Sequence, residues 1–175
     1  VVGARFDQHN LAGAQFSPRA HLKYAISPQL DLRLTGGRAW RLPNFVADNL
    51  SLLASSKTWI ADQALLPEIS WNIGASLVQG FSFKKRKGSL SLDAYHTRFS
   101  QQLVADRDTL SGAVVFKNLQ NNSLATVIQA EFSYAVLKGL DLRLAYKFQD
   151  VRALFDGTLQ TQVLLPRQRL FANMA

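Results

Sequence analysis

The chain has 175 residues with 20 Lys and Arg against 12 Asp and Glu, but its only dense basic run, 84–87, is typical of a solvated turn; because phosphate binding needs a clustered basic patch, we expect no nucleic-acid partner. There is no cysteine and the three histidines are scattered, so we expect no disulfide framework, metal site or cofactor. No segment approaches the roughly 18 apolar residues of a membrane-spanning helix, which excludes a helical membrane protein.

The first predicted elements are a strand-like run at 1–6 and a hairpin at 16–35. In the hairpin, apolar and polar residues alternate with a period of two, as in strands whose faces meet different surroundings. Ser27, Pro28 and Gln29 interrupt the alternation and predict a turn. The apolar face consists of Phe16, Ala20, Leu22, Tyr24, Ile26, Leu30, Leu32 and Leu34.

Two more hairpins follow along the chain. The first covers 71–94, with the basic run 84–87 as its turn, and the second covers 128–149, with Lys138 and Gly139 as its turn. A last strand-like run begins after Pro166. These segments, some of them fragmentary, predict about eight strands.

The connections between the hairpins differ in length from the turns within them. We predict long connections at 7–15, 42–67, 106–123 and 150–165, alternating with the three short turns. In a bacterial outer-membrane barrel the short turns face the periplasm and the long loops face outside. The alternation therefore predicts which end of the sheet lies on which side of the membrane.

The same period would suit a soluble barrel or sandwich with an apolar interior, so the second face decides between the two. The strands are long, whereas strands of soluble sheets cluster near five or six residues. The second face is polar enough for a water-filled lumen. Its charged and amide side chains are Asp31, Arg33, Gln129, Glu131, Arg143 and Lys147.

The predicted fold class is therefore all-β, an antiparallel transmembrane β-barrel. The chain begins and ends within strand-like runs, so we expect an arc of about eight strands from a larger barrel, whose edges pair with further strands. A small barrel closed by eight strands is the alternative.

Several motifs resemble the barrel of TonB-dependent receptors. The most specific are Ser-Pro-Arg at 17–19, followed by Tyr24, and Arg-x-Pro at 41–43. The run 32–44 is also similar to the barrel of that family, and the runs 138–146 and 165–169 are similar to its late-barrel segments, which implies the C-terminal part of the barrel. The resemblance covers nearly the whole chain, and identifies residues 1–175 as part of a receptor barrel domain without its plug domain.

The resemblance implies a 22-stranded parent barrel with a plugged lumen in the bacterial outer membrane. The implied partners are outer-membrane lipid, the plug domain, the TonB complex and a small extracellular ligand. The implied function is TonB-energised uptake of a scarce nutrient such as an iron chelate, cobalamin or glycan. A passive porin or structural barrel remains the alternative function.

The connection 42–67 holds the first group of candidate ligand-binding residues, because loops of this length are usually functional or disordered. The candidates are Asn44, Asp48, Asn49 and Trp59, together with Arg41 from the motif that resembles the family. Trp59 has an alternative interpretation, which is that it covers apolar loop residues such as Leu52 and Leu53.

A second group of candidates lies where the apolar alternation of residues 90–94 ends. These residues are Tyr95, His96 and Arg98. Exit of the strand from the bilayer explains the break in the pattern equally well.

We expect no enzymatic activity. His96 is near Asp93 and Ser100 in sequence, but residues three or four apart on a strand are separated by about 10 Å or more. The chain also lacks a recognisable nucleophile motif.

Overall fold

The computed structural model describes residues 1–44, 46–61, 66–106, 110–155, 158–161 and 165–175. These residues form one ten-stranded sheet and one short 3-10 helix, η1 (Ala47–Ala54). The strands are β1 (Val2–His9), β2 (Gly13–Ser27), β3 (Leu30–Arg41), β4 (Thr58–Ala61), β5 (Glu68–Phe83), β6 (Arg86–Asp106), β7 (Ala113–Leu137), β8 (Leu140–Phe155), β9 (Thr158–Thr161) and β10 (Gln168–Met174). No helix in the described ranges is long and apolar enough to cross a membrane.

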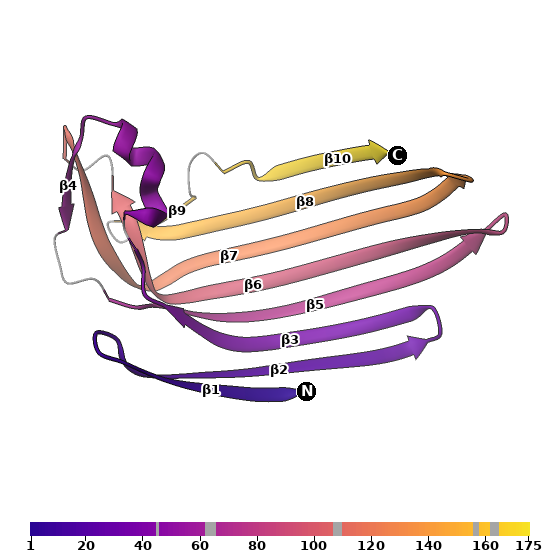
Figure 1. The fold of residues 1–175 in the computed structure, drawn as a ribbon, viewed down its shortest axis with the longest axis horizontal. Helices are drawn as coiled ribbons and strands as arrows, with labels where there is room; N and C mark the ends of the chain where they lie inside the picture. Colours follow the sequence, from indigo (N-terminus) through magenta and orange to yellow (C-terminus); the bar gives the residue numbers. More distant parts are fainter. Residues whose placement is uncertain (45, 62–65, 107–109, 156–157, 162–164) are drawn as a thin grey trace.

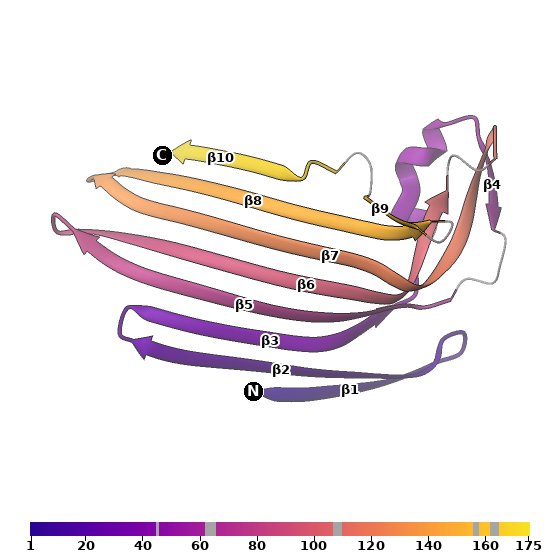
Figure 2. The same cartoon turned by 180° about the vertical axis from the view of Figure 1, so that it is seen from behind.

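Eight strands follow one another across the sheet in the order β1-β2-β3-β5-β6-β7-β8-β10 (Figure 1). Each pairs antiparallel with its neighbours. β1 and β10 occupy opposite edges, and the described strands do not close into a ring (Figure 2). The prediction of an all-β, antiparallel arc of about eight strands is confirmed.

Three tight turns join β2 to β3, β5 to β6 and β7 to β8, and all three lie at the same end of the sheet (Figure 1). Two of them use the left-handed backbone region that such hairpins require. Lys84 and Lys85 have φ of 48° and 63°, and Gly139 has φ of 79°. The three predicted hairpins and their turns are confirmed.

The prediction of a long connection at 7–15 is wrong. β1 runs to His9 and β2 begins at Gly13, so a turn of three residues joins the two strands. His9 Nδ1 accepts hydrogen bonds from the backbone N–H groups of Leu11 and Ala12, and Gly13 adopts a positive φ of 66°. Contacts within the turn itself therefore stabilise it. The run of polar and small residues at 7–15 does not indicate so short a turn.

The long connections predicted at 106–123 and 150–165 are also largely strand. β7 begins at Ala113, and β8 continues to Phe155 before β9 pairs back onto it. A register shift between Phe99 and Gln101 lets β6 and β7 continue pairing beyond the regular part of the sheet. Among the four predicted long connections, 42–67 is the one whose described residues lie mostly outside strands, and it contains η1 and β4.

The register places the predicted apolar side chains on one face across the whole sheet. Leu22 lies opposite Leu34, Leu34 opposite Ala75, and Ala75 opposite Ala94. Directly opposite residues in a ladder project from the same face. The apolar residues of separate hairpins therefore form one continuous surface.

Aromatic rings border this apolar face near the tight turns. The Phe81 ring stacks on Phe132 and Tyr134, with ring centroids 5.9 and 6.3 Å apart. Trp71 marks the other border, because its two cross-strand neighbours are Arg38 and Arg98. At roughly 3.3 Å per residue and a tilt of about 40°, the stretch 71–83 of β5 spans about 30 Å of depth, which matches a membrane band with its aromatic girdles.

Candidate functional site

Above the level of Trp71, the described residues of the loop 42–67 (42–44, 46–61 and 66–67) pack onto the extended β6–β7 hairpin and form a small folded unit, here called the cap. β4 pairs in parallel with the start of β7, with Thr58 opposite Ala113 and Ala61 opposite Phe116. Figure 1 shows η1 and β4 together at the end of the sheet opposite the tight turns. The cap therefore combines segments about 50 residues apart in sequence.

The cap has its own apolar core. Val114 and Phe116 are 0% and 1% exposed, and Leu52 of η1 closes over them. The partly buried side chains packed against this core are Trp59, Leu103 and Ala105. Because truncating a buried Phe costs about 3 to 5 kcal/mol, this core stabilises the packing of the described part of the loop on β7.

Glu68, at the start of β5, joins the cap to the sheet. Its Oε2 accepts a hydrogen bond from Arg41 Nε at 2.5 Å, and its Oε1 accepts one from the Leu103 backbone N–H at 3.0 Å. Arg41 Nη2 also lies 3.2 Å from Asp48 Oδ2 in η1. A single buried carboxylate thus links β3, β5 and β6 beneath the loop.

The electrostatics of this cluster follow from the same contacts. Arg41 lies opposite Glu68, three residues beyond the border at Trp71 and outside the apolar band. The hydrogen bond to Glu68 raises the pKa of the Arg41 guanidinium, burial lowers it in part, and the charges of Glu68 and Asp48 raise it further. Arg41 therefore stays positively charged, and its charge is already paired with the carboxylates of Glu68 and Asp48.

The face opposite the apolar surface is polar along its length. Lys23 Nζ lies 3.0 Å from Asp31 Oδ2, and Arg143 Nη2 lies 2.8 Å from Glu131 Oε1. These cross-strand ion pairs belong to separate hairpins of the same sheet. The prediction that this face carries the charged and amide residues is confirmed, and we call it the lumen face.

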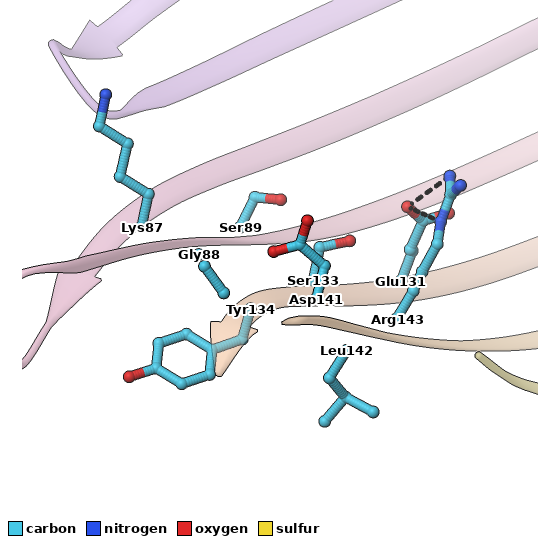
Figure 3. A pocket seen from close by; sticks show the side chains of 10 residues that line it. Lys87, Gly88, Ser89, Glu131, Ser133, Tyr134, Asp141, Leu142 and Arg143 are labelled. Carbon is cyan, nitrogen blue, oxygen red and sulfur yellow. Dashed lines mark hydrogen bonds and ion pairs between the residues drawn. The ribbon is translucent and has the colours of Figure 1, made fainter. Parts of the chain in front are cut away.

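Two hollows lie along the lumen face. One, of about 550 Å³, is lined by Lys87, Ser89, Glu131 and Arg143 close to the tight turns (Figure 3). The other, of about 640 Å³, is lined among others by His21, Lys23, Arg33, Ser76, Asp93 and Tyr95. Both present mixed charges, which suits water or a polar protein surface rather than an apolar ligand.

The loop candidates divide between the surface and the core of the cap. Asn44 and Asp48 are exposed, and Asn44 Oδ1 accepts a hydrogen bond from the Ala47 N–H at the beginning of η1. Asn49 is half-buried within η1. Trp59 packs its ring 5.2 Å from that of Phe116, so the alternative interpretation of Trp59, as a cover for apolar residues, describes its position.

The strand candidates do not converge on one point. Tyr95 lies on the lumen face over Gly74, where any Cβ would overlap its ring. His96 and Arg98 project from the opposite face, and His96 Nδ1 lies 2.9 Å from Thr126 Oγ1. Asp93 shares the lumen face with Tyr95, so the side chains of His96 and Asp93 point away from each other.

The structure brings two of the candidate residues, Arg41 and Asp48, into contact, and it adds Glu68, which the sequence analysis did not name and which connects them to the sheet. The sequence signal for Glu68 is a carboxylate directly after Pro67 at the start of a strand. This signal does not indicate which residues of other strands the carboxylate contacts. In the described part of the chain, no group of three or more His, Asp or Glu is arranged to hold a metal ion. Ligand binding by the predicted residues stays a prediction.

Long antiparallel strands with one apolar face, one polar face and tight turns at one end define the wall of a transmembrane β-barrel. The sequence matches the family described as "TonB dependent receptor-like, beta-barrel" over residues 1–169. The chain belongs to this family, whose members are receptors and transporters of the outer membrane and act together with a plug domain and the TonB system. The comparison with curated proteins found no match.

Proposed function

We propose that this barrel takes up a scarce nutrient, in the class of iron chelates, cobalamins or glycans, and that TonB supplies the energy. The observation that supports this proposal is the folded cap at the end of the sheet away from the tight turns. Its core of Leu52, Val114 and Phe116 gives the loop a defined surface, and defined surfaces recognise ligands at a lower ordering cost.

The lumen face adds a second argument for a receptor with a plug. Its ion pairs and two mixed-charge hollows offer hydrogen-bonding partners along the wall. A plug domain that must be held and then released fits polar contacts, because interfaces between domains that move relative to each other are more polar than permanent ones. No step of this function requires a catalytic residue, and we assign the protein no enzymatic activity.

Within the cap, Asp48 is our first choice for a ligand contact. It is exposed, it lies on η1, and its partner Arg41 is also exposed. Asn44 and Asn49 flank it in sequence. A polar ligand that displaced the Arg41 guanidinium would exchange one charge-assisted contact for another.

The experiment uses cells that express the full-length protein and three labelled probes: a ferric siderophore, cobalamin and a maltooligosaccharide. We expect one probe to accumulate, and we expect a protonophore or loss of TonB to abolish accumulation while leaving surface binding intact. Asp48→Ala is expected to weaken surface binding at least tenfold, whereas Ser51→Ala on the same helix is expected to leave it unchanged. Accumulation that persists without energy would instead identify a passive pore.

A further inference from the structure

One of the three tight turns differs from the others in charge. The β5–β6 turn carries Lys84, Lys85, Arg86 and Lys87 in succession, the β2–β3 turn carries no charge, and the β7–β8 turn carries Lys138 alone. Among the described residues, none of the four cations of the β5–β6 turn has a carboxylate within ion-pair distance. The β5–β6 turn therefore gathers four positive charges that no carboxylate of the described residues neutralises.

The backbone of this turn is unusual for its sequence. Lys84 and Lys85 both have positive φ, at 48° and 63°, in the conformation for which two-residue hairpins normally use Asn-Gly. Side chains with a Cβ are strained in this region. Asn-Gly at these two positions would relieve the strain. The presence of two lysines instead indicates a role for their side chains.

The turn borders the aromatic end of the apolar face. Lys84 Nζ lies 5.5 Å from the centre of the Phe83 ring, and Phe83 is 58% exposed. Tyr134 Oη donates a hydrogen bond to the Phe83 carbonyl at 3.2 Å. Aromatic side chains of this kind gather where a barrel crosses from hydrocarbon to headgroups.

The four cations also divide between the two faces. Arg86 lies opposite Phe83 in the ladder and shares the apolar face, whereas Lys87 lines the hollow of the lumen face (Figure 3). Lys84 and Lys85 form the tip and are exposed. Three of the four charges are therefore placed at or beside the surface that meets lipid.

We propose that Lys84, Lys85 and Arg86 bind the phosphate headgroup of an anionic phospholipid in the periplasmic leaflet, with the acyl chains beside Phe83 and Phe81. This inference rests on the proposed function, with the tight turns of the barrel facing the periplasm. The adjoining aromatic surface favours a lipid over a free phosphate, because a free phosphate has no acyl chain to place against it. A cluster of basic residues next to a membrane attracts anionic lipid in proportion to its charge.

The test places the full-length protein in phosphatidylcholine nanodiscs that contain a small fraction of phosphatidylglycerol with a nitroxide on its acyl chain. Residues 1–175 contain no cysteine, and any cysteine elsewhere in the full-length protein is replaced first. A dye on Leu90→Cys, on the apolar face of the β5–β6 hairpin, reports quenching by lipid at the basic turn, and a dye on Ile26→Cys, on the same face and equally exposed, reports quenching beside the uncharged β2–β3 turn. We expect quenching at position 90 to exceed that at position 26, and to fall as salt is added.

Two double variants separate charge from backbone geometry. Lys84→Asn with Lys85→Gly removes two charges and relieves the strain, so it should fold at least as well and weaken lipid association by roughly 30-fold. Lys84→Arg with Lys85→Arg keeps both charges and should retain the association. If the Asn-Gly variant does not fold, Lys84→Asn alone is expected to weaken association about fivefold.

Unchanged quenching in a folded Asn-Gly variant would overturn the proposal, as would equal quenching by nitroxide-labelled phosphatidylcholine. None of these outcomes bears on uptake, which is measured separately. A protein that does not insert into nanodiscs at all would contradict the proposed function itself.

Discussion

Replacing Glu68 by Ala tests how the cap is held to the barrel wall. The substitution removes the acceptor for the Leu103 N–H and for Arg41 Nε in one step. It leaves the core of the cap, formed by Leu52, Val114 and Phe116, intact. We therefore expect the cap to open more often while the transmembrane strands keep their stability.

The expected change in the free energy of cap opening follows from the burial of the two groups that lose their contact with Glu68. An unpaired, partly buried backbone N–H costs about 1 to 3 kcal/mol. The Arg41 side chain is 59% exposed, so water replaces much of what it loses, and its ion pair contributes below about 1 kcal/mol. The total of about 3 kcal/mol corresponds to roughly 100-fold more frequent opening. Glu68→Gln keeps an acceptor for the amide and should give about a fivefold change.

Hydrogen exchange read out by mass spectrometry on the full-length protein in lipid measures this opening. Protection of peptides that cover 101–106 should decrease from the wild type to Glu68→Gln, and decrease further in Glu68→Ala. Asp48→Asn is the matched control, because it breaks the exposed half of the same cluster and should change exchange less than threefold. Protection that is unchanged in Glu68→Ala would refute the assignment of Glu68 as the link.

Three further substitutions test other parts of the structure. Phe116→Ala should destabilise the cap by about 3 to 5 kcal/mol, detected as faster proteolysis of the loop with unchanged barrel melting. Gly74→Ala should lower the urea midpoint by the equivalent of about 1 to 3 kcal/mol, because its Cβ would overlap the Tyr95 ring, and the effect should vanish in a Tyr95→Ala background. Leu92→Arg on the apolar face should cost about 2 to 4 kcal/mol of stability in lipid, whereas Ser91→Arg beside Glu131 should cost little; equal effects would contradict the assignment of faces.

Strand identity was predictable wherever the alternation was unbroken. The run 140–149 alternates throughout, and it forms β8 paired with β7 in the predicted hairpin. The tight turns were marked by Ser-Pro, by consecutive lysines and by Lys-Gly. These signals are local, so one sequence is sufficient to detect them.

The cap was not predictable, because long-range pairing creates it. Val114, Val115 and Phe116 are consecutive apolar residues with no alternation, since β4 covers this part of β7 and the hairpin projects beyond the regular wall. The shift between Phe99 and Gln101 also changes the phase of β6. Glu68 was missed for a related reason, as its two partners lie on strands 27 and 35 residues away.

A cysteine scan along β6 tests the central claim most directly. Residues 1–175 contain no cysteine, and any cysteine elsewhere in the full-length protein is replaced first. Nitroxides attached singly at positions 89 to 94 of the full-length protein in lipid are compared for collision with oxygen, which concentrates in hydrocarbon, and with a water-soluble nickel chelate. Positions 90, 92 and 94 should favour oxygen, and positions 89, 91 and 93 should favour the chelate. Access to the chelate at all six positions, or the opposite alternation, would contradict a transmembrane barrel wall with Leu90 and Leu92 facing lipid.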